Sequence, residues 1–381
     1  MTRRLVTDIS VTKSNKRCEE FMRNNTPILL GAGDFVQGPG VLHELGRIVQ
    51  KYGTHALIVA GKTPWKKVGS VTANSLQAAG VGFELHEFSG YCSDTTTDEV
   101  ARKAKAMSAD VIVGIGGGKC LDTAKWGSEK AKLRVVTVPT SVATCAAYVS
   151  LCVLYDDTGS TIKSVFTERE VGAVVLDTEL IATNCPSRMF ASGIADALAK
   201  EPELYFSIRY SSDWEKSVLP DIGFEIASFN TRRYFSQGES ALNAVKSNTL
   251  TMDVEDIACA NIALTGMVSC LASGGKQLAI AHSIYDCITT HFKPQRAAFL
   301  HGEIVSCGIQ VQMAVNGYGE DRIAEMVTFL KQIGTPTSLR DIGVEPTDGN
   351  LRIILEYVFQ NMGIIDSHLK DLIEKQIERI S

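Results

Sequence analysis

The first half of the chain alternates short apolar runs with stretches of helical periodicity, and this alternation restricts the fold more than any other feature. Strands are predicted for the apolar runs Ala56–Val59, Phe83–Phe88, Val111–Ile115 and Arg134–Val138. A helical pattern follows each of the first three runs, as at Asp98–Met107. Strands that alternate with helices in this way favour right-handed βαβ units. The sequence therefore predicts an α/β domain built on a parallel sheet.

The remainder of the chain has a different pattern. Two runs, Val149–Tyr155 and Ser160–Phe166, flank a turn and predict an antiparallel hairpin. From about Pro186 onward the apolar residues recur at helical spacing, as in Asp256–Leu271 and Arg322–Ile333. We therefore predict an α/β domain over residues 1–165 and a helical domain over residues 166–381.

Composition excludes several classes of function. A net charge of −5 gives the chain no general attraction to nucleic acid or to an anionic membrane. Neither a signal peptide in residues 1–21 nor a membrane span is expected, because no long apolar run is present. The ten cysteines are scattered without CxxC pairs. They predict reduced thiols and a cytoplasmic location.

A glycine cluster lies between a predicted strand and the next helix. It consists of Gly116, Gly117 and Gly118, followed by Lys119. Glycines let the backbone approach a phosphate closely, and a helix N-terminus offers free N–H groups to it. An ordinary βα turn explains three glycines equally well, and their spacing does not match G-x-G-x-x-G.

Three side chains in the helical half suggest a metal site. Asp196, His282 and His301 all lie in or beside apolar helical stretches, where unpaired polar groups are costly. Two histidines and one aspartate would leave an open position on a divalent ion, as catalysis requires. Taken singly, each also fits a buried histidine or a salt-bridged carboxylate.

Five motifs, which occur in a fixed order along the chain, include both the glycine cluster and the three candidate metal ligands. GGGKCLDTAK, VTVPTSVAT, GIADALAK, AHSIY and LHGE together resemble the iron-containing alcohol dehydrogenase and glycerol dehydrogenase superfamily. The resemblance covers nearly the whole chain. It implies a dehydroquinate synthase-like fold, with a Rossmann-like dinucleotide-binding domain and an all-α domain for metal and substrate. It also implies hydride transfer between a substrate and a nicotinamide dinucleotide, and a homo-oligomer.

The resemblance assigns roles residue by residue. Gly116, Gly117, Gly118, Lys119 and Asp122 would lie along the cofactor pyrophosphate. The other residues assigned to the cofactor are Thr140 and Thr144, with Leu151 and Tyr155 beside the nicotinamide. Asp196, His282 and His301 would bind the metal in the cleft between the domains.

Departures from the family pattern narrow this interpretation. Iron-type members have a histidine where this chain has Lys200, so a three-ligand zinc site is predicted, although Fe²⁺ also suits these donors. Glycerol dehydrogenases have an aspartate at Cys145. NAD-preferring members have an acidic residue at the strand end where this chain has Ala60-Gly61-Lys62. Lys62 suits a 2′-phosphate, so NADP is at least as well supported as NAD.

These departures look most like the bacterial hydroxycarboxylate dehydrogenase branch, whose members reduce small 2-oxo acids. Lys200 would then hold the substrate carboxylate, with Cys145 beside the substrate; a surface position for Lys200 is the ordinary alternative. Other interpretations are a glycerol dehydrogenase, a glycerol-1-phosphate dehydrogenase, a lyase related to 3-dehydroquinate synthase and a nucleotide-binding protein without catalysis.

Overall fold

The computed structural model describes residues 29–210, 218–272 and 279–381. Residues 1–21, for which no signal peptide is expected, lie outside these ranges. Within them, one helical stretch, Met252–Leu271, is long and apolar enough to cross a bilayer by length and composition alone. Most of that stretch is buried against the rest of the protein, as in a core helix.

The α/β domain contains one six-stranded sheet in which all neighbouring strands are parallel. The strand order is β1-β8-β5-β4-β2-β3. The strands are β1 (Asp34–Gly38), β2 (His55–Gly61), β3 (Gly82–Phe88), β4 (Val111–Gly116), β5 (Arg134–Pro139) and β8 (Ala173–Asp177). The four predicted strands are β2 to β5, and the predicted parallel sheet is confirmed.

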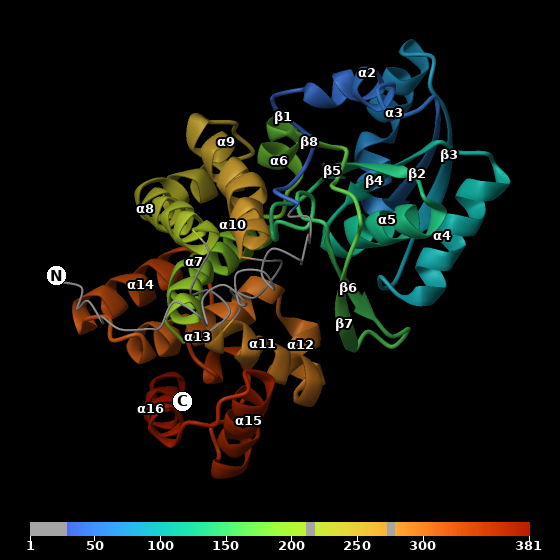
Figure 1. Ribbon diagram of the computed structural model, residues 1–381. Helices are drawn as coiled ribbons and strands as arrows, with labels where there is room; N and C mark the ends of the chain where they lie inside the picture. The colour runs from blue at the N-terminus through green and yellow to red at the C-terminus, as the bar shows by residue number, and fades with distance from the viewer. Residues whose placement is uncertain (1–28, 211–217, 273–278) are drawn as a thin grey trace, which may run out of the picture.

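Helices follow these strands and cover the sheet (Figure 1). They are α2 (Leu45–Val49) after the short turn η1 (Val41–Glu44), α3 (Lys62–Ala78), α4 (Asp94–Ala106), α5 (Gly118–Ala131) and α6 (Thr178–Asn184). Helix α4 begins before the predicted Asp98, because Ser93 and Thr96 form a capping box at its start.

The predicted hairpin is also present. Strands β6 (Leu151–Tyr155) and β7 (Thr161–Phe166) pair antiparallel and form a separate two-stranded sheet. The predicted domain boundary at residue 165 falls inside β7, whereas the large sheet also takes in β8. A single apolar strand at Ala173–Asp177 has no βα repeat around it in the sequence, which is why its partnership with β1 and β5 was not apparent.

The second domain is helical in every part that the structure describes. Its helices are α7 (Ser187–Tyr210), α8 (Leu219–Lys246), α9 (Met252–Cys259), α10 (Thr265–Leu271), α11 (Ile280–His291), α12 (Lys293–Ala298), α13 (His301–Val315), α14 (Glu320–Gln332), α15 (Asp348–Asn361) and α16 (Ser367–Ile377). A π-helical turn η3 (Ala260–Leu264) joins α9 to α10, and short 3-10 turns occur at Arg340–Ile342 and Glu378–Ile380.

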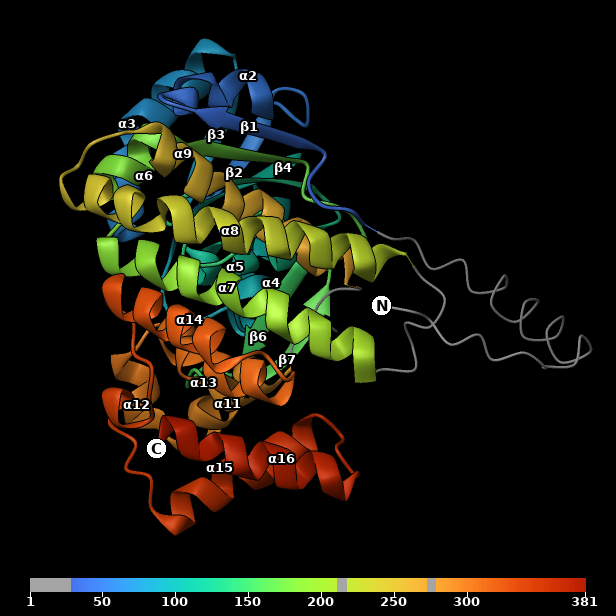
Figure 2. The same cartoon turned by 90° about the vertical axis from the view of Figure 1, so that its left-hand side faces the viewer.

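Helix α7 is the central element of this domain. It packs along α8 and also against α13 (Figure 2). Its apolar residues, including Phe190 and Ile194, share one core with Val142 and Ala147 of the α/β domain. Polar side chains on α7 are therefore buried where the two domains meet, so each needs a specific partner.

Candidate active site

The three predicted metal ligands come together from three different helices. Asp196 lies in the middle of α7, His282 in the first turn of α11 and His301 at the first residue of α13. Oδ1 of Asp196 lies 3.1 Å from Nε2 of His282 and 3.2 Å from Nε2 of His301. The folding of the helical domain thus joins residues that are 86 and 105 positions apart.

This donor set fits a divalent metal ion. The three ligand atoms all lie within 4.8 Å of one another, and bonds of about 2.0–2.2 Å to a shared ion would suit that spacing. Asp196 and His282 are each only 4% exposed, while His301 is less deeply buried. Burial opposes ionisation of Asp196, but Lys200 and His301 hold its pKa well below its ordinary value. The carboxylate is therefore an anionic ligand, as metal binding needs.

Glu203 supports this cluster from behind. Its Oε2 lies 2.6 Å from Nδ1 of His282, and its Oε1 accepts hydrogen bonds from the backbone N–H groups of His282 and Ala279. Because a carboxylate only accepts, Nδ1 of His282 carries a proton, and Nε2 is the atom that would bind a metal ion. The sequence analysis missed Glu203. Its spacing of seven residues from Asp196, on one face of an apolar helix, is the signal that could have identified it.

Lys200 lies beside the cluster and is 5% exposed, so the surface alternative is wrong. Its Nζ is 3.2 Å from Nε2 of His282 and 3.5 Å from Oδ1 of Asp196. Burial alone would lower the pKa of Lys200, but the carboxylates of Asp196 and Glu203 raise it. The site therefore contains a buried ammonium group in addition to the metal-ligand set.

Cys145 lies in the loop after β5, with its Sγ 3.9 Å from Oγ of Ser269 on α10. Burial raises the pKa of the Cys145 thiol, although the nearby Lys200 ammonium opposes that rise. The thiol is consequently neutral and brings no charge to the site, unlike the aspartate expected at this position in a glycerol dehydrogenase.

The glycine cluster forms a close turn at the start of α5. Gly117 is the N-cap of α5, and no side chain caps this end of the helix. A Cβ atom on Gly116 would lie 2.9 Å from Cβ of Cys120, and one on Gly118 would lie 3.2 Å from Oγ1 of Thr144. The first N–H groups of α5 therefore have no side-chain acceptor, and uncapped N–H groups at a helix start are the kind that bind phosphate.

Thr140 and Thr144 lie around the same turn. The Thr140 backbone N–H donates to the carbonyl oxygen of Gly116, and Thr144 faces Gly118. Lys119 lies 4.2 Å from the ring centroid of Tyr91 and 5.8 Å from that of Tyr155 on β6. Lys62 is exposed at the first position of α3, directly after β2.

Asp122 has a different environment from the one expected. Its Oδ2 accepts the backbone N–H of Val153 on β6, and its Oδ1 lies 2.9 Å from Nζ of Lys125. Lys125 is fully buried and donates to the carbonyl oxygens of Val149 and Leu151. Both carboxylate oxygens of Asp122 are therefore engaged within the protein. The pair joins α5 to β6, where Leu151 and Tyr155 lie.

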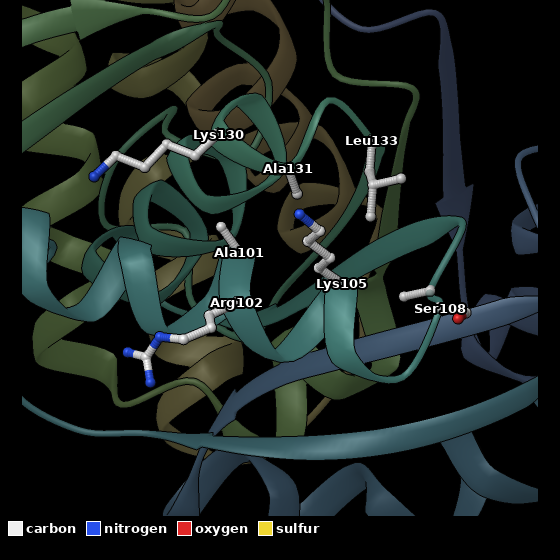
Figure 3. Close-up of a pocket in the computed structure, with 8 residues that line it drawn as sticks. Ala101, Arg102, Lys105, Ser108, Lys130, Ala131 and Leu133 are labelled. Carbon is white, nitrogen blue, oxygen red and sulfur yellow. The ribbon is translucent and has the colours of Figure 1, made fainter.

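A separate surface pocket lies between α4 and α5 and has a volume of about 550 Å³. It is lined by Ala101, Arg102, Lys105, Ser108, Ala109, Lys130, Ala131 and Leu133. Figure 3 shows the Lys130 side chain directed away from Leu133, and its Nζ pairs with Asp94 and Asp98. None of the predicted site residues lines this pocket, so it is not the candidate active site.

Comparisons with known proteins identify the family of this chain. The family model for iron-containing alcohol dehydrogenase matches residues 32–178. Glycolaldehyde reductase of Halobacterium salinarum is 31% identical, over 87% of this chain and 89% of that protein. Hydroxycarboxylate dehydrogenase A of Escherichia coli is 29% identical, over 84% of this chain and 87% of its own.

The fold is also found in solved structures. The crystal structure of glycerol dehydrogenase from Schizosaccharomyces pombe superposes with a TM-score of 0.81 and 24% identity, over 93% of this chain and 91% of that chain. The five motifs, the parallel sheet with its helical partner domain, and these relatives lead to one conclusion. The chain belongs to the superfamily of iron-containing alcohol dehydrogenases and glycerol dehydrogenases, and it is an oxidoreductase of that family.

Proposed function

We propose that the protein is a metal-dependent dehydrogenase that transfers a hydride between NAD(P)H and a small 2-oxo acid, in equilibrium with the 2-hydroxy acid. The observation that carries this proposal is the buried Lys200 ammonium beside Asp196, His282 and His301. Among the carboxylates of the described residues, Lys200 pairs only with that of Asp196, at 3.5 Å, and a metal ion bound to that carboxylate would compete for the pairing. A buried cation in this position favours an anionic substrate, because a buried charge needs a partner. Glycerol and dihydroxyacetone have no charge that would pair with it.

Each part of the site has a role in the proposed reaction. A divalent ion held by Asp196, His282 and His301 would supply Lewis acidity at the substrate carbonyl, and NAD(P)H would supply the hydride. Glu203 fixes the tautomer of His282 and so aims its Nε2 at the cluster. Lys200 binds the substrate carboxylate and thereby orients the carbonyl carbon toward the cofactor.

The cofactor is proposed to lie along the α/β domain. The N-terminus of α5, with Lys119, binds the pyrophosphate, and Thr140 and Thr144 lie along the cofactor. Leu151 and Tyr155 pack against the nicotinamide from the hairpin. Lys62 supports NADP(H) over NAD(H), because it is exposed at the end of β2 and pairs with no carboxylate among the described residues. We propose Zn²⁺ as the ion, since one carboxylate and two imidazoles form the donor set.

Glycerol dehydrogenase is the second candidate for the function. It is favoured by the glycerol dehydrogenase of Pseudomonas putida, which is 30% identical over 85% of this chain and 87% of that protein. A glycerol-1-phosphate dehydrogenase would also give Lys200 an anionic substrate. We further propose a cytoplasmic homo-oligomer that acts on a small molecule and binds neither nucleic acid nor membrane; the nine cysteines in the described ranges are all free thiols.

The experiment compares oxidation of NADPH and NADH with 2-oxoglutarate, 2-oxobutanoate, glyoxylate, glycolaldehyde and dihydroxyacetone. Each is measured on chelator-treated protein before and after Zn²⁺ is restored. Zn²⁺-dependent turnover of the 2-oxo acids with NADPH supports the proposal. Turnover of dihydroxyacetone with NADH, without turnover of 2-oxo acids, would instead identify the glycerol dehydrogenase activity.

A further inference from the structure

The ring of Tyr285 lies between Arg296, on α12, and the proposed metal ligand His301. Its guanidinium carbon is 5.4 Å from the ring centroid of Tyr285, and that ring packs edge-on against the ring of His301, with centroids 4.1 Å apart. Tyr285 is 6% exposed, so the contact between these two rings is well packed. Arg296 therefore packs against Tyr285, which in turn packs against His301, and these contacts fix where the guanidinium lies.

The charge of Arg296 is not neutralised within the described residues. Its Nη1 donates to the carbonyl oxygen of Phe299, and no carboxylate oxygen of the described ranges lies within 4 Å of the guanidinium. Arg188 shows the contrasting case. Arg188 contacts Phe299 as well, but it forms a two-pronged ion pair with Glu303, at 2.6 and 2.7 Å. Arg188 thus has a carboxylate partner, whereas Arg296 has none among the described residues.

Lys119 belongs to the other domain and is the cation that the proposed function assigns to the cofactor pyrophosphate. Lys119, at the start of α5, also lacks a carboxylate partner among the described residues, and it lies over Tyr91. Burial lowers the pKa of Lys119, and the nearby positive charge of Arg296 lowers it further. Helix α12 is held beside the hairpin of the first domain, where Lys293 donates to Oγ of Ser160. Helix α12, which carries Arg296, therefore lies where the helical domain meets the hairpin of the first domain.

We propose that Arg296 forms an anion subsite that binds the far end of the substrate, so that dicarboxylic 2-oxo acids are preferred. The proposal rests on the proposed function, in which the substrate carbonyl is bound beside His301. Lys200 contacts the carboxylate next to the carbonyl, and Arg296 contacts the carboxylate at the other end of the molecule. Arginine suits this task because its guanidinium binds carboxylates in a planar, two-pronged geometry.

The test compares two substrates that differ in one carboxylate. Arg296→Gln should lower kcat/KM for 2-oxoglutarate about 10- to 100-fold, mainly through KM, because a charge-assisted hydrogen bond is lost. The change for 2-oxobutanoate should stay within a few-fold. Arg296→Lys should restore part of the loss. Arg352→Gln, an exposed arginine on α15, removes the same charge elsewhere and controls for net charge.

Three outcomes would overturn the proposal. Equal losses on 2-oxoglutarate and 2-oxobutanoate would mean that Arg296 only supports Tyr285 and His301. A rise in KM for NADPH with every substrate would place the bound anion on the cofactor. Unchanged kinetics with both acids would make Arg296 an ordinary surface residue.

A binding measurement separates this proposal from the proposed function. Should the wild-type protein turn over no 2-oxo acid, the proposed reaction is wrong, and the anion subsite is then tested by calorimetric titration with 2-oxoglutarate. Binding that is lost in Arg296→Gln and retained in Arg352→Gln supports the subsite. Binding that is absent, or equal in all three proteins, contradicts it.

Discussion

Glu203 lies with one carboxylate oxygen 2.6 Å from Nδ1 of His282 and with the other on the backbone N–H of the same residue. One buried side chain thus holds both the ring and the backbone of a proposed metal ligand. Burial opposes the ionised form of Glu203, but the attraction of His282 keeps its pKa below the ordinary value. The carboxylate therefore makes the imidazole a stronger donor toward the cluster.

Glu203→Gln should weaken Zn²⁺ binding about 10- to 100-fold, because the amide is a poorer acceptor for Nδ1–H. The measurement is a competition titration against a chelator, with the bound metal counted by mass spectrometry. Glu201→Gln is the matched control, since Glu201 lies on the same helix but pairs with Arg322. Equal metal affinity in the two variants would show that Glu203 does not tune the site.

Lys200→Met should raise KM for 2-oxo acids about 10- to 100-fold, because the substrate carboxylate loses a charged partner. Uncharged glycolaldehyde and dihydroxyacetone should change far less. The measurement is steady-state kinetics of the same preparation on both kinds of substrate. Equal effects on acids and uncharged aldehydes would remove Lys200 from carboxylate binding.

Lys200→His should strengthen metal binding at the same site. The change removes a positive charge whose Nζ lies 3.2 Å from Nε2 of His282 and adds an imidazole donor. Titration with Zn²⁺ and with Fe²⁺ under anaerobic conditions should give lower dissociation constants than for wild type. Weaker binding of both ions would mean that the side chain at position 200 does not face the bound metal.

Lys125→Met should destabilise the protein by about 3–5 kcal/mol, because Asp122 would remain buried as an unpaired charge. The double variant Lys125→Met with Asp122→Asn should recover part of that loss, since no charge then stays buried. Chemical unfolding measures both changes. Lys130→Met, on the same helix, should cost no more than about 1 kcal/mol, because its ion pairs with Asp94 and Asp98 are more exposed.

Asp286→Asn should stabilise the protein at alkaline pH and have little effect at acidic pH. Burial raises the pKa of Asp286 from 3.8 to about 6, and His282 opposes that rise only in part. The contribution of this group to stability is therefore greatest below about pH 4 and is lost as the pH rises through about 6. The gain for the variant should approach about 3 kcal/mol at pH 8. Melting temperatures between pH 4 and 8 measure it, and a gap that does not vary with pH would contradict this cause.

The elements that repeat locally could be predicted from the sequence. Strands β2 to β5, the hairpin and the helices α4 and α14 each have a pattern complete within about fifteen residues. Strand β8 could not be recognised as part of the sheet, because its partners β1 and β5 are remote and no local periodicity records that pairing. The domain boundary was therefore placed before it.

In the candidate site too, some residues could be recognised from the local sequence and others only from the packing of helices. Asp196, His282 and His301 could be named because imidazole and carboxylate are conspicuous in apolar stretches. Glu203 follows Glu201 in a segment that looks like an ordinary polar turn of a helix, and only the packing of α7 against α11 shows its partner. Asp122 was assigned to the cofactor because the glycine turn is near in sequence, whereas the helix directs its carboxylate to β6.

Helix α5 connects two places that a dinucleotide would have to reach at once. Its first turn carries the N–H groups after Gly117 that no side chain caps. Asp122 and Lys125, within the next two turns, form hydrogen bonds to β6. A helix rises about 1.5 Å per residue and hardly stretches. The eight residues from Gly118 to Lys125 therefore keep the two ends of this segment about 10 Å apart. The spacing between a bound phosphate and the strand beside the nicotinamide is therefore fixed inside one rigid body. Relative motion of the two domains could open the cleft to a substrate without changing that distance.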